Sequence, residues 1–81
     1  MADWRVDNAK HTVGQTLYFK KYKRPSESWD HDHCEACWAT FMETDGPEIL
    51  TEGYATHDEY RWICSQCFQD LKEEMNWTLG N

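Results

Sequence analysis

Cys34-Glu35-Ala36-Cys37 and Cys64-Ser65-Gln66-Cys67 are two Cys-x-x-Cys pairs, and 26 residues separate them. The two-residue spacer makes a tight turn that lets both thiolates of a pair reach one ion, and four thiolates complete a tetrahedron around Zn²⁺. We therefore predict one structural zinc ion bound by Cys34, Cys37, Cys64 and Cys67. Four protein ligands leave no open coordination position, so this ion is not expected to activate water.

The short length of the chain explains why its fold would need a bound metal for stability. Its 81 residues fit a single small domain, residues 1–81. A core of that size is marginal by itself, and folds this small are usually held by disulfides or a metal. The N-terminus lacks the basic segment and apolar run of a signal peptide, and no stretch reaches the roughly 20 apolar residues that span a bilayer. We therefore expect a cytoplasmic location, where cysteine pairs bind metal or carry redox chemistry. Two disulfides, or thiol redox chemistry, are the alternatives to zinc.

The charge of the chain restricts its partners. The formal net charge is −7 at pH 7, which repels phosphate backbones and anionic membranes. We expect a protein partner of basic character, and neither nucleic acid nor membrane. The acidic excess is strongest after residue 42, at Glu43, Asp45, Glu48, Glu52, Asp58, Glu59, Asp70, Glu73 and Glu74.

The N-terminal third predicts one short helix and one strand. A weak helical face formed by Trp4, Val6, Ala9 and Val13 predicts a short helix, or a less ordered arm, within residues 1–14. Residues 15–24 alternate with a period of two and are rich in β-formers, which predicts a strand. This strand ends in half of all eight basic residues, with Tyr22 interleaved: Lys20, Lys21, Lys23 and Arg24. An anion-binding patch is one interpretation, but we favour an edge strand whose lysines block unwanted pairing.

The remaining elements follow turn signals at residues 25–28 and 44–47. Residues 49–56 and 59–63 predict two strands joined at His57-Asp58. A helix is predicted from an N-cap at Ser65 to about Asn76, with an apolar face at Phe68, Leu71 and Met75. The predicted order is a cysteine knuckle, then a hairpin, then a second cysteine pair at the start of a helix. This is the order of elements in the treble-clef class of zinc modules. We therefore predict a small α+β zinc-stapled domain with short antiparallel strands and a C-terminal helix.

Aromatic residues accompany both cysteine pairs. Each pair is followed by an aromatic residue and then a large apolar one, a faint repeat that predicts a helical turn after each knuckle. We expect four aromatic side chains to form an apolar wall that keeps water from the sulfurs: Trp29, Trp38, Trp62 and Phe68.

The stretch Asp30-His31-Asp32-His33 runs directly into the first pair. Alternating Asp and His can build a second metal site, a histidine base held by a carboxylate, or a replacement for one cysteine ligand. The stretch resembles the Asp-His-Asp-His motif of treble-clef endonucleases of the His-Me type. In that family, however, the motif lies between the two pairs and an Arg-Gly-rich stretch follows it. Because of this difference, we favour a hydrogen-bonding role for these histidine or aspartate side chains beside the knuckle. A metal-dependent nuclease that uses the stretch is the alternative.

The chain as a whole resembles short uncharacterised bacterial zinc-binding proteins. The resemblance rests on His-Asp-His-Cys-x-x-Cys-Trp at residues 31–38 and Trp-Ile-Cys-x-x-Cys-Phe at residues 62–68. It implies a bound metal and a cytosolic location, and it carries no activity. The sequence therefore predicts a small interaction protein, such as an adaptor, inhibitor or immunity-type factor, rather than an enzyme.

Overall fold

A computed structural model describes residues 4–24, 26–29 and 31–80. The first elements of the described chain are helix α1 (Trp4–Ala9) and a single 3-10 turn, η1 (Lys10–Thr12). Seven short strands follow, interrupted by one longer helix, α2 (Ser65–Met75). The strands are β1 (Thr16–Lys21), β2 (His31–His33), β3 (Thr40–Met42), β4 (Ile49–Leu50), β5 (Glu52–Ala55), β6 (Trp62–Ile63) and β7 (Thr78–Leu79). The predicted small α+β fold with a C-terminal helix is confirmed.

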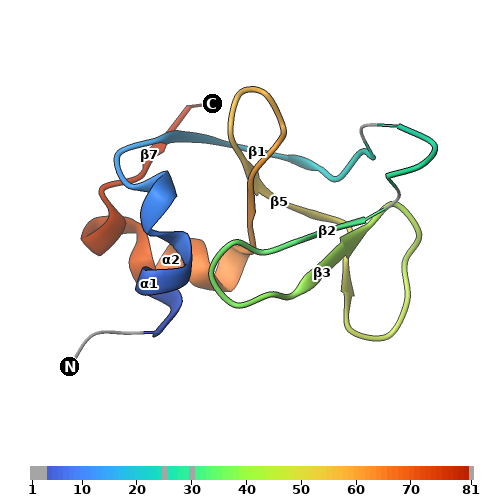
Figure 1. Ribbon diagram of the computed structural model, residues 1–81, viewed down its shortest axis with the longest axis horizontal. Coiled ribbons are helices and arrows are strands. Elements are labelled where there is room, and N and C mark those ends of the chain that lie inside the picture. The colour runs from blue at the N-terminus through green and yellow to red at the C-terminus, as the bar shows by residue number, and fades with distance from the viewer. Residues whose placement is uncertain (1–3, 25, 30, 81) are drawn as a thin grey trace.

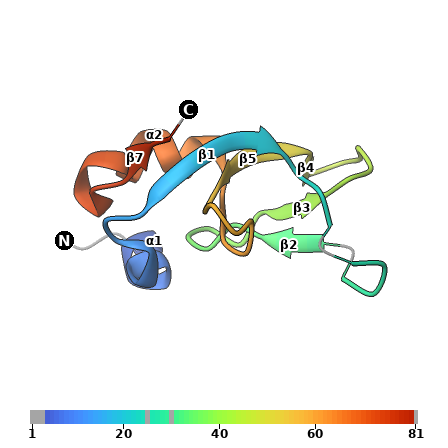
Figure 2. The same ribbon diagram turned by 90° about the horizontal axis from the view of Figure 1, so that it is seen from above.

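The strands form two small sheets. One has the order β6-β5-β1-β7 and the other the order β2-β3-β4. In Figure 1 both helices lie at the end of the molecule where β7 is found, and β2 and β3 extend toward the other end. Figure 2 shows β1 and β5 arching over one side, with β2 and β3 beneath them. The predicted antiparallel pairing is present for β1 with β5, β2 with β3 and β5 with β6, whereas β1 with β7 and β3 with β4 are parallel.

The predicted strand over residues 49–56 is in fact two strands in different sheets. Ile49–Leu50 pairs with β3, a bend occurs at Thr51, and Glu52–Ala55 pairs with β1. Gly53 lets the chain pass from one sheet to the other close to Phe41, because a Cβ atom at residue 53 would lie 2.7 Å from the Phe41 ring. The next strand is also shorter than predicted, since only Trp62–Ile63 of residues 59–63 pairs, in a hairpin with β5.

Strand β1 lies within the strand predicted at residues 15–24, and its two apolar side chains differ in burial. Leu17 is fully buried, whereas Phe19 is exposed and packs edge-to-face on its cross-strand neighbour Tyr54. Tyr22 was predicted among the lysines, yet it is buried in the core, with its ring 5.0 Å from Trp62. Lys20 and Lys21 pair with β5, whereas β7 pairs with β1 only at Thr16 and Leu17, so among the described strands the basic end of β1 has a neighbour on one side only.

Helix α2 presents its predicted apolar face to the core. Phe68, Leu71 and Met75 are all buried, and Asn76 ends the helix in a left-handed conformation with φ of 57°. Trp77 then packs back against the N-terminal segment, and its indole N–H donates to the Thr12 carbonyl at 3.1 Å. Leu79, by contrast, is exposed on β7.

The N-terminal segment folds as a helix, but only half of its predicted face is covered. Ala9 is buried and Val6 packs against the core, whereas Trp4 and Val13 are exposed. Because α1 is short and ends in a 3-10 turn, its residues do not keep one continuous helical stripe.

Candidate metal centre

The two cysteine pairs come from different kinds of local structure. The first pair lies in the loop between β2 and β3, which is closed by a hydrogen bond from the Cys34 N–H to the Ala39 carbonyl at 2.7 Å. The second pair opens α2, with Cys64 at the N-cap and Cys67 in the first turn. The Glu35 N–H donates to the Trp62 carbonyl at 2.8 Å, which ties the first loop to the strand before the second pair.

This arrangement brings the four sulfurs together. The Sγ atoms of Cys34, Cys37, Cys64 and Cys67 all lie within 4.8 Å of one another, and those of Cys37 and Cys64 are 3.6 Å apart. Sulfurs bound at the ~2.3 Å Zn–S distance of a tetrahedral site would lie roughly 3.8 Å from one another. All four cysteines are free thiols, and three of them are buried. The donor set therefore fits a tetrahedral metal ion of the thiolate-binding kind, as the sequence predicted.

Backbone N–H groups point at the sulfurs. The Cys34 sulfur accepts from the amides of Ala36 and Cys64, at 3.4 and 3.3 Å, and the Cys64 sulfur accepts from the Cys67 amide at 3.4 Å. Such N–H groups favour negative charge, as does the positive end of the α2 dipole. The N-cap is thus the Cys64 sulfur, and the prediction of Ser65 in that role was wrong.

Crowding of the sulfurs opposes full ionisation. Hydrogen bonds from the Cys64 and Cys67 thiols lower the pKa of Cys34 to about 2. Hydrogen bonding to Cys34 raises the pKa of Cys64 to about 12, and hydrogen bonding to Cys34 and Cys64 also raises that of Cys67. By itself the cluster therefore opposes the simultaneous ionisation of Cys34, Cys64 and Cys67. A bound cation is what would allow all four sulfurs to ionise.

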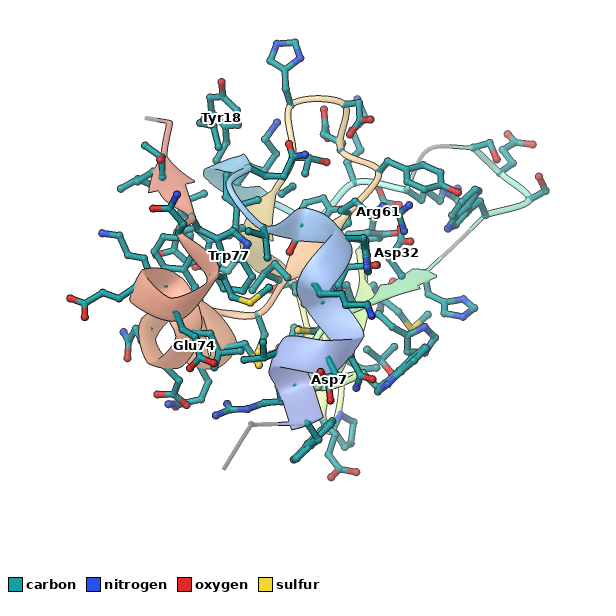
Figure 3. All side chains as sticks on the ribbon, turned by 60° about the vertical axis from the view of Figure 1, so that its left-hand side comes forward. Asp7, Tyr18, Asp32, Arg61, Glu74 and Trp77 are labelled. Carbon is teal, nitrogen blue, oxygen red and sulfur yellow. The ribbon has the colours of Figure 1, made fainter. Side chains whose placement is uncertain are left out.

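The N-terminal helix reaches over the site, which the sequence did not predict. Arg5 donates to the Cys67 sulfur at 3.8 Å and to the Asp70 carboxylate at 3.0 Å. Asn8 donates to the Ala36 carbonyl inside the first pair at 2.9 Å. In Figure 3, α1 lies in front of the region between α2 and the hairpin of β2 and β3. These contacts span 62 and 28 residues of sequence, and no spacing rule connects them.

A carboxylate inside the first pair is also shared between distant residues. Glu35 accepts from Arg61 at 3.2 Å and lies 2.6 Å from the His11 Nε2 atom. His11 was not singled out by the sequence, and it fixes the end of the N-terminal segment to the knuckle.

The predicted aromatic wall is only half present. Trp62 and Phe68 are buried beside the cysteines, but Trp29 is 40% exposed and Trp38 is 64% exposed. Trp38 also follows the first pair with φ of 70°, and the chain continues as strand β3. The prediction of a helical turn after each knuckle was therefore wrong for the first pair.

The Asp-His stretch does not join the sulfurs. In the described part of the chain, the residues close enough to share one ion are the four cysteines, and neither histidine is among them. His31 and His33 lie on β2 with ring centroids 5.1 Å apart. Asp32, labelled in Figure 3, accepts a hydrogen bond from the Tyr22 hydroxyl at 2.8 Å rather than from the knuckle. Asp30 lies outside the described residues.

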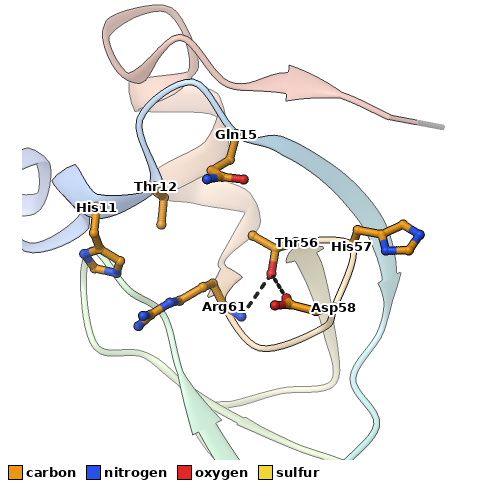
Figure 4. Close-up of a pocket in the computed structure, with 7 residues that line it drawn as sticks. All are labelled: His11, Thr12, Gln15, Thr56, His57, Asp58 and Arg61. Atoms are coloured by element: carbon orange, nitrogen blue, oxygen red, sulfur yellow. Dashed lines mark hydrogen bonds between the residues drawn. The ribbon is translucent and has the colours of Figure 1, made fainter.

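A polar pocket of about 390 Å³ lies beside the centre, between the N-terminal segment and the loop that joins β5 to β6 (Figure 4). It is lined by His11, Thr12, Gln15, Thr56, His57, Asp58 and Arg61. The Thr56 hydroxyl donates to Asp58 at 2.6 Å and accepts from the Arg61 amide at 3.2 Å. The first of these bonds, with one from the Tyr60 amide, lowers the pKa of Asp58. These groups hold the loop in shape, as expected for a polar turn.

No protein-family model, curated protein or solved structure matches this chain. Neither helix among the described residues is long and apolar enough to cross a membrane.

Proposed function

We propose that the four sulfurs hold one structural Zn²⁺ in a treble-clef-like module, and that the protein acts as an interaction protein such as an adaptor, inhibitor or immunity-type factor. The observation that carries the proposal is the convergence of four sulfurs within 4.8 Å from a hairpin loop and a helix N-terminus. A knuckle in a hairpin and a second pair at a helix start are the two halves of a treble clef.

The environment of the sulfurs supports a structural role for the ion. Four protein thiolates would fill a tetrahedral sphere, and catalytic zinc sites keep one position open. Cys34, Cys64 and Cys67 are buried, and Arg5 and the backbone amides already point at sulfurs. The free thiols that the ion needs also require a reducing compartment such as the cytosol.

The acidic surface supports binding of a basic protein. The formal charge is −7, and four thiolates with one Zn²⁺ would make the protein two units more negative. Such a field accelerates association with a positively charged partner and weakens with added salt.

Two measurements test the proposal. Elemental analysis of protein purified without added metal should give one zinc per chain. Affinity capture from a cell extract, followed by purification of the captured protein, should yield a direct complex that weakens as salt rises. A folded protein without metal would refute the zinc centre, and failure to find a direct partner at low and moderate salt would count against the interaction role.

A metal-dependent nuclease is a second candidate, and one observation favours it. The rings of His31 and His33 lie side by side at the surface on β2, where a metal or a phosphodiester could reach them. The acidic charge opposes nucleic-acid binding, and Asp32 faces Tyr22 instead of the histidines. Cleavage of DNA with Mg²⁺ or Mn²⁺ that is lost in His33→Ala, with zinc content unchanged, would favour the nuclease.

A further inference from the structure

The outer face of the sheet β2-β3-β4 is an uncovered surface that the metal centre does not use. Residues on short strands alternate between faces, and Phe41 faces the core with Asp32 directly opposite it in register. The neighbouring positions therefore face outward: His31, His33, Thr40, Met42 and Ile49. We call these five residues, together with Trp38, the outer face.

This face carries apolar side chains that are not packed into the hydrophobic core. Met42 and Ile49 are each half-buried, yet neither belongs to the core or to the residues packed against it, whereas Leu50, the next residue along β4, does. Trp38 is 64% exposed, and its ring centroid lies 6.2 Å from that of His33. A row of three rings therefore runs along one edge of the face, from His31 through His33 to Trp38.

The backbone of Trp38 is held in a conformation that is energetically unfavourable for a bulky residue. Its φ of 70° lies in the left-handed region, which bulky residues rarely adopt. A hydrogen bond from its N–H to the Cys34 carbonyl at 3.0 Å keeps it there, so the metal knuckle positions the indole. Tryptophan fixed at a surface in an unfavourable conformation is typical of a binding residue, and exposed indoles are common binding hot spots.

The chain after Trp38 supplies acidic residues around the outer face. From Trp38 to Thr56 the sequence contains four acidic residues and no Lys, Arg or His. Asp45 and Glu48 lie exposed in the loop between β3 and β4, which returns along the sheet because these two strands are parallel. Glu43, in the same loop, pairs with Arg24 at 3.3 Å. One arginine or lysine of a partner segment could therefore lie over the Trp38 ring, while other cations of the same segment pair with the carboxylates of this loop.

We propose that the outer face docks a basic segment of another protein, with its cationic side chains over Trp38 and its apolar side chains on Met42 and Ile49. This inference rests on the proposed interaction function and assigns its surface. A second copy of the chain fits less well, because it would bring a formal charge of −7 against another −7. A nucleic acid is disfavoured by the same charge.

The test uses the reduced, zinc-loaded full chain and a labelled peptide of four Arg-Val repeats, with a Glu-Val peptide of equal length as the charge control. Fluorescence anisotropy should show binding of the Arg-Val peptide alone. Trp38→Ala should weaken it at least ten-fold, and Asp45→Lys with Glu48→Lys should weaken it by a similar factor. Phe19→Ala, an exposed aromatic residue on the other sheet, should leave it within two-fold. Amide shifts in an NMR titration should concentrate at residues 31–33 and 38–49.

Several results would overturn the proposal. One is equal binding by wild type and Trp38→Ala when both carry one zinc; another is shifts spread evenly over the acidic helix α2. A third is a dimer in sedimentation that Trp38→Ala converts to a monomer, which would make the face a self-association surface. A folded protein that contains no zinc would instead refute the proposed metal module, so the two failures are distinguishable.

Discussion

Removal of the metal should unfold this protein, and the expected size of the effect can be worked out. A domain of 81 residues has a stability of about 4–12 kcal/mol, at roughly 0.05–0.15 kcal/mol per residue. A structural zinc contributes an apparent binding free energy of about 10–16 kcal/mol that couples to folding. The metal contribution therefore matches or exceeds the whole expected stability. Without the ion, the raised pKa values of Cys64 and Cys67 also show that the crowded sulfurs resist ionisation.

The assay is a zinc titration of the reduced, chelator-treated chain. Far-UV circular dichroism should report little helix before zinc is added and a transition complete at one equivalent. Tryptophan emission should shift to the blue at the same point, because Trp62 is fully buried in the folded chain. Cys34→Ala should abolish the transition, since it removes a buried sulfur that accepts hydrogen bonds from the amides of Ala36 and Cys64, one in each pair.

Ser65→Ala is the matched control. Ser65 lies between Cys64 and Cys67, is exposed, and leaves the N-cap to Cys64. Its effect on the free energy of unfolding should stay within about 0.5 kcal/mol. The reasoning would be refuted if the metal-free, reduced chain kept its helix content and melted cooperatively at the same temperature, or if mass spectrometry found disulfides.

Three further predictions concern single positions. Arg5→Gln should speed transfer of zinc to a chromogenic chelator, because a cation would no longer face the sulfur cluster, while Arg5→Lys should restore part of the slow rate. Gly53→Ala should lower the free energy of unfolding by about 1–3 kcal/mol in a denaturant titration, because the new methyl would lie 2.7 Å from the Phe41 ring; an unchanged midpoint would contradict this crossing of the sheets. Thr56→Val should raise the pKa of Asp58 toward its usual value, as measured by NMR titration, because the main bond that lowers it is removed. Since the folded pKa of Asp58 is depressed, its contribution to stability is present above about pH 4 and lost as the pH falls, and this acid dependence should shrink in Thr56→Val.

The metal donors and the core face of α2 could be predicted from sequence because both are local patterns. Two thiolates separated by two residues reach one ion in many backbone contexts, and Phe68, Leu71 and Met75 share a face in any helix. The position of a strand at residues 16–21 was also predictable from its period of two.

The tertiary structure decided what depends on contacts between distant residues. The bend at Thr51 occurs because two sheets compete for one stretch of chain, and Arg5 meets Cys67 across 62 residues of sequence. Trp38 was expected inside and lies outside, because the hairpin loop turns its side chain away from the core through a left-handed backbone conformation. Local spacing fixes which atoms can bind a metal, but only the packed chain fixes which of the remaining side chains face water and are free to meet a partner.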